Sequence, residues 1–277
     1  MASIQQRQPE QRPQSPALRL VQDISTSLVR EEPPCRAASP QTKALGTRIA
    51  GSHRFVPAGS ALYFEGDQGG DLYVVLDGWM IQYQILSDGC RQILEFALPG
   101  AILGCVSPSK PTLNHSVESL TGATVAVIPR ARVLELCRSD PEFSLHLISA
   151  GAASLNLAFE SITDIGRRTA REAVAHVLLR LYTRVRAQCP RSTEASVMLP
   201  LTQTHIGDAC GLTSVHVCRT LSKLRKDGIV SLRDGTLHVL DLDALRRDSM
   251  ANWANAPGID RHHPVDQARA RPIRLAS

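Results

Sequence analysis

Short apolar runs cut by Gly, Pro and Asp fill residues 49 to about 130, and their length is typical of β-strands. The runs lie at 61–64, 72–76, 79–86, 92–96, 101–104 and 123–128. Asp-Gly pairs at Asp77-Gly78 and Asp88-Gly89 favour tight turns between them. We therefore predict an antiparallel β-roll or barrel for this part of the chain.

A helical pattern replaces the strand pattern further along the chain. Apolar, small and polar residues recur at alternating spacings of four and three, at Leu155, Phe159, Ile162, Gly166, Thr169, Ala173 and His176. This spacing is typical of a helix that associates with a second copy of itself. We predict a homodimer seam formed by Leu155, Phe159, Ile162 and Thr169, strongest in its apolar first half. A helix packed only on its own roll is the alternative, but about thirty helical residues exceed what a small roll can cover.

Residues 199–221 carry the most specific pattern in the chain. Thr202 is placed to cap one helix and Thr213 the next, with Gly211 between them as a left-handed turn residue. The small core between the two crossed helices is expected to consist of Ile206, Cys210, Leu212, Val217 and Leu221. This arrangement predicts a helix-turn-helix.

Two short strands follow the second helix directly, at 229–232 and 236–240, with an Arg-Asp-Gly turn at 233–235. Strands in this position form a wing beside a recognition helix. A winged fold used only for protein contacts is the alternative, but the basic side chains on and after the second helix favour DNA. They are Arg219, Lys223, Arg225 and Lys226.

The chain has 277 residues, which suggests about two domains. Its N-terminal region is rich in Gln, Pro, Arg and Ser, a composition that predicts disorder. The predicted fold class is α+β, with an N-terminal antiparallel β-roll, a long dimerisation helix and a C-terminal winged helix-turn-helix. The expected parts are a disordered arm at 1–48, a β-roll sensor domain at 49–135, helices including the dimerisation helix at 136–188, the winged helix-turn-helix at 189–246 and a flexible tail at 247–277.

The charge and the cysteine content of the chain exclude few classes of function. The 31 Lys and Arg against 26 Asp and Glu give a formal net charge of +5, which permits a polyanionic partner. The 7 cysteines are odd in number and irregularly spaced, so we expect thiols. Apolar runs are too short for a membrane span, and the N-terminus lacks the apolar core of a signal peptide. We therefore expect a cytoplasmic protein without a membrane partner.

The sequence contains few residues in the patterns that an enzyme active site requires. A roll enzyme of the cupin type needs a His-x-His pair with further ligands, whereas the roll offers only the scattered His53 and His115. Neither a Cys-x-x-Cys pair nor a phosphate-cradling glycine loop stands out. We expect no catalytic residues and no metal site, with a cupin-like enzyme as the remote alternative.

Several roll motifs precede the long helix and the helix-turn-helix. They are Pro57-Ala58-Gly59, Phe64-Glu65-Gly66-Asp67 and the runs 72–78 and 98–104. In this order, over about residues 48–245, the chain resembles the CRP/FNR family of bacterial transcription regulators, on the FNR and FixK side more than on the cAMP-binding side. The resemblance implies a cyclic-nucleotide-binding-like roll. It also implies a homodimer that reads a near-palindromic site in double-stranded DNA and regulates transcription through RNA polymerase.

The same resemblance implies which residues meet DNA. They are Thr202, Thr204 and Thr213 at phosphates, Ser214, Val215, Cys218 and Arg219 at base edges, and Lys223 and Arg233 beside them. Arg219 is expected to read guanine, because a guanidinium can bridge O6 and N7; a phosphate contact or an internal ion pair is the alternative. Val215 stands where many relatives carry Glu, so we expect an operator that departs from the usual family sequence.

The resemblance also identifies where an effector would bind in the roll. The cAMP-binding relatives use Gly-Glu-Leu for the ribose and Arg-Ser for the phosphate, where this chain has Gly104-Cys105-Val106 and His115-Ser116. Their adenine-binding hydroxyls on the dimer helix fall at about 158–159, which are Ala and Phe here. Losing the ribose acceptor and the phosphate charge together argues against cAMP.

The sequence leaves undecided which cofactor, if any, the protein binds and how its DNA binding is regulated. Haem held by Cys90, Cys105 or His115, or an iron–sulfur cluster, has no supporting spacing, so the effector is unknown. The regulator could work without an effector. It could also be controlled by oxidation of Cys218, since a sulfenate or sulfinate beside Arg219 would press bulk and then charge against phosphates. A Cys218 that only packs beside a base is the alternative.

Overall fold

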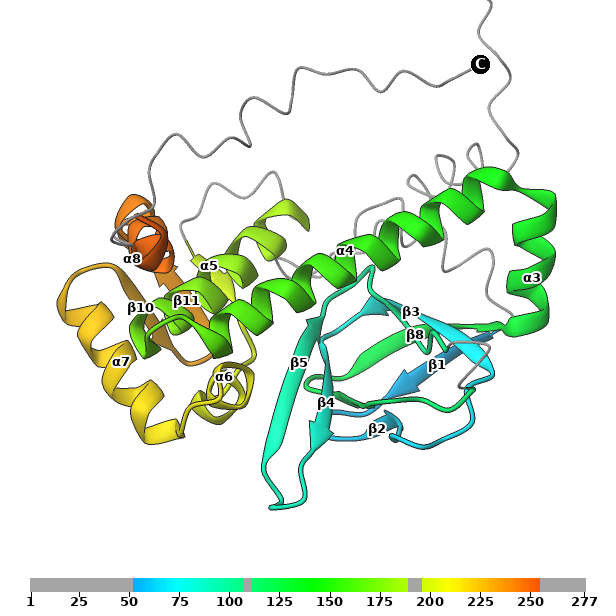
Figure 1. The fold of residues 1–277 in the computed structure, drawn as a ribbon, viewed down its shortest axis with the longest axis horizontal. Coiled ribbons are helices and arrows are strands. Elements are labelled where there is room, and N and C mark those ends of the chain that lie inside the picture. The colour runs from blue at the N-terminus through cyan, green and yellow to red at the C-terminus, as the bar shows by residue number, and fades with distance from the viewer. Residues whose placement is uncertain (1–51, 107–110, 189–195, 255–277) are drawn as a thin grey trace, which may run out of the picture.

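The computed structural model describes residues 52–106, 111–188 and 196–254, and its first part is a β-roll of two antiparallel sheets (Figure 1). One sheet has the order β1-β8-β3-β6, and the other has the order β2-β7-β4-β5. The first sheet consists of β1 (Ser52–Val56), β3 (Asp71–Asp77), β6 (Ile102–Leu103) and β8 (Ala123–Pro129). The second consists of β2 (Ala61–Tyr63), β4 (Met80–Ile85), β5 (Arg91–Ala97) and β7 (Ser116–Ser119). The predicted antiparallel roll is confirmed.

The two predicted Asp-Gly turns have different tasks in the roll. Asp88-Gly89 lies at the tip of the β4–β5 hairpin, with Gly89 at a φ of 82°. Asp77-Gly78 instead carries the chain from β3 in one sheet to β4 in the other. Gly78 has a φ of 84°, and a Cβ there would lie 2.5 Å from the carbonyl oxygen of Gly122. This crossing therefore needs a glycine.

Helix α3 (Arg130–Ser139) follows β8 directly, and α4 (Pro141–Gly166) then runs along the roll towards the other end of the molecule (Figure 1). Asp140 caps α4, because its carboxylate accepts from the backbone N–H of Glu142 at 3.0 Å and of Phe143 at 3.3 Å. Along α4 only Phe143 and Asp164 are buried. Most of this long helix is therefore open to solvent in a single protomer.

The prediction of one helix that continues past Thr169 is wrong. Helix α4 ends at Gly166, and α5 (Ala170–Gln188) begins after a short link and folds back along α4. Thr169 and Glu172 cap α5: the Glu172 carboxylate accepts from the Thr169 N–H at 2.8 Å, and the Glu172 N–H donates to the Thr169 hydroxyl at 3.4 Å. This capping box gives the first donors of α5 their own acceptors, so a second helix starts where the spacing had suggested continuity.

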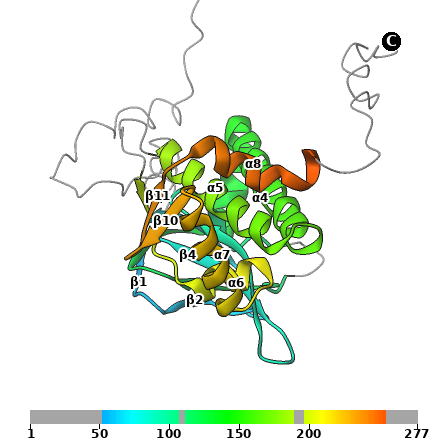
Figure 2. The ribbon, with the colours of Figure 1, turned by 90° about the vertical axis from the view of Figure 1, so that its left-hand side faces the viewer.

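The C-terminal part forms a compact unit around two short helices (Figure 2). Its elements are β9 (Ser196–Met198), α6 (Gln203–Cys210), α7 (Ser214–Lys226), β10 (Val230–Arg233), β11 (Thr236–Val239) and α8 (Leu242–Ala254). The three strands form one sheet in the order β10-β11-β9. The predicted two-stranded wing is present, and β9 adds a third strand to it that the sequence pattern did not indicate.

Helix α8 corrects the predicted flexible tail at 247–277, because the helix runs on to Ala254. The Asp241 carboxylate accepts from the Ala244 N–H at 2.8 Å, and Leu245 is buried. Asp248 of α8 lies 2.7 Å from Arg171 of α5. The predicted domain limit at 135 falls inside α3 and that at 246 inside α8, whereas the predicted arm at 1–48 and residues 255–277 lie outside the described part of the chain.

One apolar core joins the β4–β5 side of the roll to the C-terminal unit. The roll contributes Ile81, Tyr83, Ile93, Phe96 and Leu98, and the helices contribute residues that include Leu178, Leu181, Ile206, Val217 and Leu224. A second core, with Val75, Met80 and Val117, fills the space between the two sheets. In the described ranges, every helix is too short or too polar to cross a lipid bilayer.

Candidate nucleic-acid interface

The turn between α6 and α7 is built from side-chain caps and one left-handed residue. The Thr202 hydroxyl accepts from the His205 N–H at 3.2 Å, and His205 Nδ1 accepts from the Thr202 N–H at 3.2 Å. Thr213 caps α7 by accepting from the His216 N–H at 3.3 Å. Gly211 ends α6 with a φ of 67°. The predicted caps and turn residue are confirmed.

The two helices approach most closely at Gly207, which the sequence pattern did not single out. A Cβ on Gly207 would lie 2.4 Å from the carbonyl oxygen of Leu212, whose N–H donates to the Gly207 carbonyl at 2.9 Å. A glycine inside a short capped helix was the available signal. The predicted core is confirmed: Ile206, Cys210 and Val217 are buried, while Leu212 and Leu221 are partly buried against them.

Helix α7 turns one side to this core and the other to solvent, at the end of the molecule that faces the viewer in Figure 2. Its buried residues are Val217, Thr220 and Leu224. The residues expected at base edges are all exposed, and they are Ser214, Val215, Cys218 and Arg219. Two further exposed residues of α7, His216 and Ser222, were not predicted as contacts. The fold therefore leaves this side of the helix available to a partner.

The wing lies directly after α7 in the chain. Asp234 and Gly235 have φ values of 48° and 71°, which fits a two-residue turn of the type favoured in hairpins. Arg233 is exposed at the β10 end of this turn and pairs with Thr236 across the ladder. A basic side chain thus stands at the tip of the wing, as predicted.

Positive charge on α7 and the wing is not neutralised by any residue that the structure describes. Within the described ranges, Arg219, Lys223, Arg225, Lys226 and Arg233 form no ion pair. Thr202 and Thr204, expected at phosphates, are exposed at the start of α6. Hydroxyls at helix N-termini and unpaired cations are suited to a phosphate backbone.

A stripe of exposed apolar side chains follows α4 on alternating spacings of three and four. Leu155, Phe159 and Ile162 are 53%, 55% and 65% exposed, and the stripe continues upstream to Leu145 and Ile148. Ala152 fills the intervening position, and Gly166 ends the series. The upstream half was not predicted, although the same spacing marks it in the sequence. Thr169 lies apart from the stripe, in the link that caps α5.

In the roll, Gly104, His115 and Ser116, which belong to the two motifs compared with cAMP-binding relatives, form hydrogen bonds with other roll residues. The Tyr63 hydroxyl accepts from the Gly104 N–H at 3.2 Å and lies 3.1 Å from His115 Nε2. Burial lowers the pKa of His115, which favours a neutral ring that accepts from this hydroxyl. The Ser116 hydroxyl accepts from the Glu65 N–H at 3.0 Å. The Tyr63 hydroxyl thus links Gly104, the residue before Cys105, to His115.

The thiols considered as cofactor ligands lie apart along the roll. Cys90 is exposed at the β4–β5 hairpin and Cys105 is exposed after β6. Over 52–106, 111–188 and 196–254, no three His, Cys, Asp or Glu side chains gather as a metal site would require. The described cysteines, which also include Cys137, Cys210 and Cys218, are all free thiols.

Comparison with known proteins connects both halves of the chain to characterised domains. The sequence profile of the cyclic nucleotide-binding domain matches residues 53–140, and that of the Crp-like helix-turn-helix domain matches residues 172–248. The first match covers the roll and α3. The second covers α5, the helix-turn-helix, the wing and the beginning of α8.

Individual relatives extend this similarity over most of the described chain. The transcriptional activatory protein AadR of Rhodopseudomonas palustris is 32% identical over 194 residues, which cover 70% of this chain and 79% of AadR. The nitrogen fixation regulation protein FixK of Bradyrhizobium diazoefficiens is 32% identical over 184 residues, covering 66% and 76%. The solved structure of FixK2 from Bradyrhizobium japonicum superposes with a TM-score of 0.64 at 27% identity, covering 71% of this chain and 96% of that chain.

Proposed function

This chain belongs to the CRP/FNR family of transcription regulators, and we propose that it binds a near-palindromic operator as a homodimer and acts through RNA polymerase in the cytoplasm. The observation that carries the proposal is the solvent-exposed side of α7, which presents Ser214, Val215, Cys218 and Arg219 while its opposite side is buried in the core. A recognition helix needs this combination, because its outer side must enter the major groove while its inner side stays fixed.

Within the proposed interface, Arg219 reads guanine. Its side chain is exposed and forms no ion pair with a described residue, so the guanidinium is available to bridge O6 and N7. Val215 offers only an apolar contact, for example with a thymine methyl group. Thr202, Thr204 and Thr213 contact phosphates at the two helix N-termini. Lys223 on α7 and Arg233 on the wing add phosphate contacts that set register and affinity.

The proposed dimer is formed by the apolar stripe of α4. Its members follow heptad spacing from Leu145 through Leu155 and Phe159 to Ile162, and a single protomer leaves them exposed. Two α4 helices paired along this stripe would bring two copies of the C-terminal unit to the same end of the dimer. Their recognition helices could then reach successive major grooves, about 34 Å apart.

We propose further that DNA binding needs no cyclic nucleotide. The hydroxyl of Tyr63 already occupies the hydrogen-bonding groups of Gly104 and His115, so a nucleotide would have to displace a buried tyrosine. Breaking these bonds without replacing each of them leaves buried polar groups unpaired.

Control by oxidation is a second candidate, favoured by one observation. Cys218 is exposed on α7 immediately before Arg219, so an oxidant and the DNA would compete for the same surface. Peroxide treatment is then expected to weaken DNA binding of the natural chain and to leave a Cys218→Ser variant unaffected. Equal loss in both proteins, or loss in neither, would exclude Cys218 as the switch.

The central experiment is selection of bound duplexes from a random-sequence DNA library with purified, reduced protein and no added nucleotide. A near-palindromic consensus is the expected result, and sedimentation of the complex should show two protomers per duplex. Selection only after cAMP or another nucleotide is added would contradict effector-independent binding. Absence of any consensus, with and without nucleotides, would contradict sequence-specific recognition by α7.

A further inference from the structure

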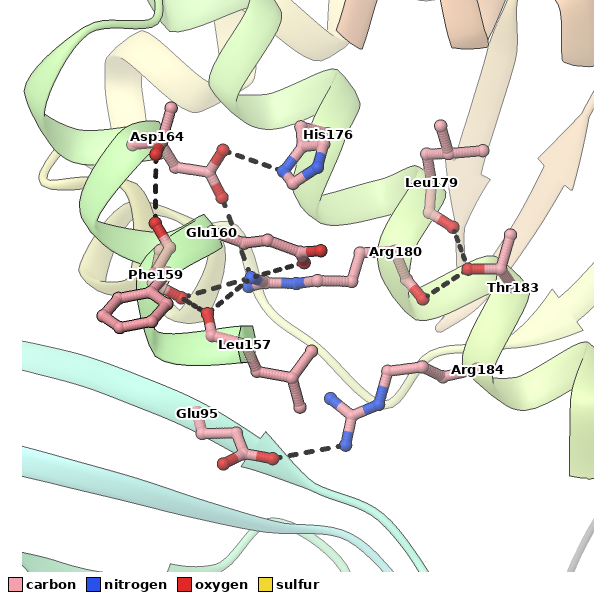
Figure 3. Close-up of polar contacts among 12 residues, drawn as sticks. Glu95, Leu157, Phe159, Glu160, Asp164, His176, Leu179, Arg180, Thr183 and Arg184 are labelled. Carbon is pink, nitrogen blue, oxygen red and sulfur yellow. Dashed lines mark hydrogen bonds and ion pairs between the residues drawn. The ribbon is translucent and has the colours of Figure 1, made fainter. Parts of the chain in front are cut away.

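A buried carboxylate lies where α4 gives way to α5. The side chain of Asp164 is completely inaccessible to solvent, although it stands only two residues before the end of α4. Its Oδ1 accepts from Arg168 in the link and lies 2.8 Å from Nδ1 of His176 in α5, and this Nδ1 also lies 3.1 Å from Nη1 of Arg168. Figure 3 shows the carboxylate facing His176 and Arg180 across the gap between the two helices. The Asp164 side chain of α4 therefore contacts both the link and α5.

Arg180 of α5 extends this contact over two turns of α4. Its Nη1 lies 3.9 Å from Oδ2 of Asp164 and 3.6 Å from the carboxylate of Glu160. The same nitrogen donates to the Leu157 carbonyl at 3.4 Å (Figure 3). It also donates to the Ser161 hydroxyl at 3.2 Å. These four contacts of the Arg180 guanidinium with α4 oppose any sliding or rotation of α5 along α4.

The hydrogen-bonding groups of this cluster are not all paired, even with α4 and α5 in their present positions. Oδ2 of Asp164 and Nε of Arg180 are buried without a hydrogen-bond partner among the described residues. A buried charge is tolerated only while its counterions stay in place, because solvent cannot replace them. A shift of α5 that moved His176 and Arg180 away would leave Arg168 of the link as the carboxylate's one remaining partner among the described residues. Apolar packing alone would penalise such a shift far less sharply.

The position of α5 determines the position of the recognition helix. Leu178 and Leu181 of α5 share one apolar core with Ile206 of α6 and Val217 of α7. At the end of α4, Ile165 reaches the α6–α7 turn itself, where a Cβ on Gly211 would come within 3.7 Å of its Cγ2. The C-terminal unit therefore follows whatever angle α4 and α5 adopt.

The same face of α5 also contacts the roll. His176, Arg180 and Arg184 are spaced four apart, and Arg184 lies 3.4 Å from the carboxylate of Glu95 in β5 (Figure 3). Burial raises the pKa of Glu95, and Arg184 opposes that rise. One row of side chains therefore positions α5 against both α4 and the roll.

We propose that Asp164 is a positioning residue for DNA recognition: with His176 and Arg180 it locks the angle between the dimer helix α4 and the DNA-binding unit. The lock matters because the two recognition helices of a dimer must match successive grooves at one fixed spacing. The inference rests on the proposed dimeric DNA binding. It concerns the geometry of the two units, not the stability of either one.

The test compares three variants with the natural chain. Asp164→Asn removes the charge, so Arg168 loses its carboxylate partner and Arg180 keeps only that of Glu160. Asp164→Leu combined with Arg180→Met replaces the pair by apolar side chains, a change that often preserves or raises stability. Glu160→Gln is the matched control, because Glu160 also contacts Arg180 from α4 but is 46% exposed. Each protein is measured for thermal unfolding, for dimerisation by sedimentation, and for affinity to the selected operator and to an unrelated duplex.

The double variant is expected to fold and dimerise like the natural chain but to bind the operator at least about tenfold more weakly, with little change towards unrelated DNA. Asp164→Asn should show the same selective loss, and Glu160→Gln should bind normally. If the stable double variant bound the operator as tightly as the natural chain does, the inference would be overturned, because the cluster would then serve stability alone. If Asp164→Asn does not fold, the double variant alone decides.

Hydrogen exchange provides a readout that does not depend on DNA. In the double variant, amides at the start of α5 and in the α6–α7 turn should exchange faster, while those of the roll sheets and of α4 before residue 157 stay unchanged. Unchanged exchange in the turn would overturn the lock even if no operator is ever selected. Failure of the proposed DNA binding is recognised separately, because the natural chain itself would then select no consensus.

Discussion

The guanidinium of Arg91 in β5 donates to the carboxylate of Asp208 in α6 at 2.8 Å, an ion pair between residues 117 positions apart. It joins the roll to the first helix of the helix-turn-helix. Arg91 also lies 5.7 Å from the ring centroid of Tyr83 and 3.8 Å from Glu118, so its side chain is held on several sides. The contact stands at the edge of the apolar core that the two halves share.

We expect this ion pair to contribute little to stability. Its side chains are 24% and 19% exposed, and partly solvated pairs are worth about 1 kcal/mol or less. A double-mutant cycle with Arg91→Gln and Asp208→Asn, followed by urea unfolding, should give a coupling energy in this range. A coupling of several kcal/mol would mean that water is excluded from the pair far more than its exposure indicates.

Arg219→Ala should weaken binding to the selected operator by about 1–3 kcal/mol, that is about 5- to 150-fold, and relax selection at one base pair. Lys223→Ala should weaken operator and unrelated duplex alike and lower the salt dependence by about one unit. Arg132→Ala is the matched control, since α3 lies at the opposite end of the molecule from α7 (Figure 1). Anisotropy titrations at several salt concentrations measure all three. Equal loss on both duplexes for Arg219→Ala would make this residue a phosphate contact.

Ile162→Glu should dissociate the proposed dimer and abolish tight operator binding. The substitution removes an apolar contact from each protomer and forces two carboxylates towards each other in the α4 seam. Ile85→Glu is its control, because Ile85 is 60% exposed on the β4–β5 hairpin against 65% for Ile162 on α4. Sedimentation of both variants gives the oligomeric state. A dimeric Ile162→Glu protein would show that the interface lies elsewhere.

The thiols of the helix-turn-helix should react at very different rates. Burial raises the pKa of Cys210 to about 12, so its thiolate is scarce at pH 8, and the side chain is also shielded. Because the reactive species is the thiolate, raising the pKa lowers the alkylation rate at any pH below it. Cys218 is exposed and should be alkylated first by iodoacetamide, with protection when operator DNA is bound.

Peptide mapping by mass spectrometry resolves the two sites. Cys210 should become reactive only in urea, together with loss of helical signal. Rapid labelling of Cys210 in the folded protein would show that the α6–α7 core opens frequently. Labelling of Cys218 that is unaffected by bound operator would remove this thiol from the proposed interface.

Local signals explain why the helix-turn-helix could be predicted in detail. Thr202, Gly211 and Thr213 act through hydrogen bonds to neighbours three or four residues away or through their own φ, so a linear pattern contains all the necessary information. The same holds for the Asp234-Gly235 turn.

Other features escaped prediction for identifiable reasons. The break between α4 and α5 was masked because Gly166, Thr169, Ala173 and His176 continue the spacing of the seam, although Thr169 and Glu172 are a capping-box signal. Helix α8 begins with an Asp cap that was equally visible. The Asp164 cluster is different in kind, since its partners come from another helix and only the folded chain brings them together.

The shared apolar core has a consequence for exchanging either half of this chain. Ile81, Ile93 and Phe96 of the roll lie in one cluster with Leu178 and Leu181 of α5. The boundary between the roll and the DNA reader is therefore not a boundary of folding. A chimera that replaced the roll would need a β4–β5 hairpin that fits the α5 surface. One that replaced the C-terminal unit would need an α5 surface that fits the β4–β5 hairpin.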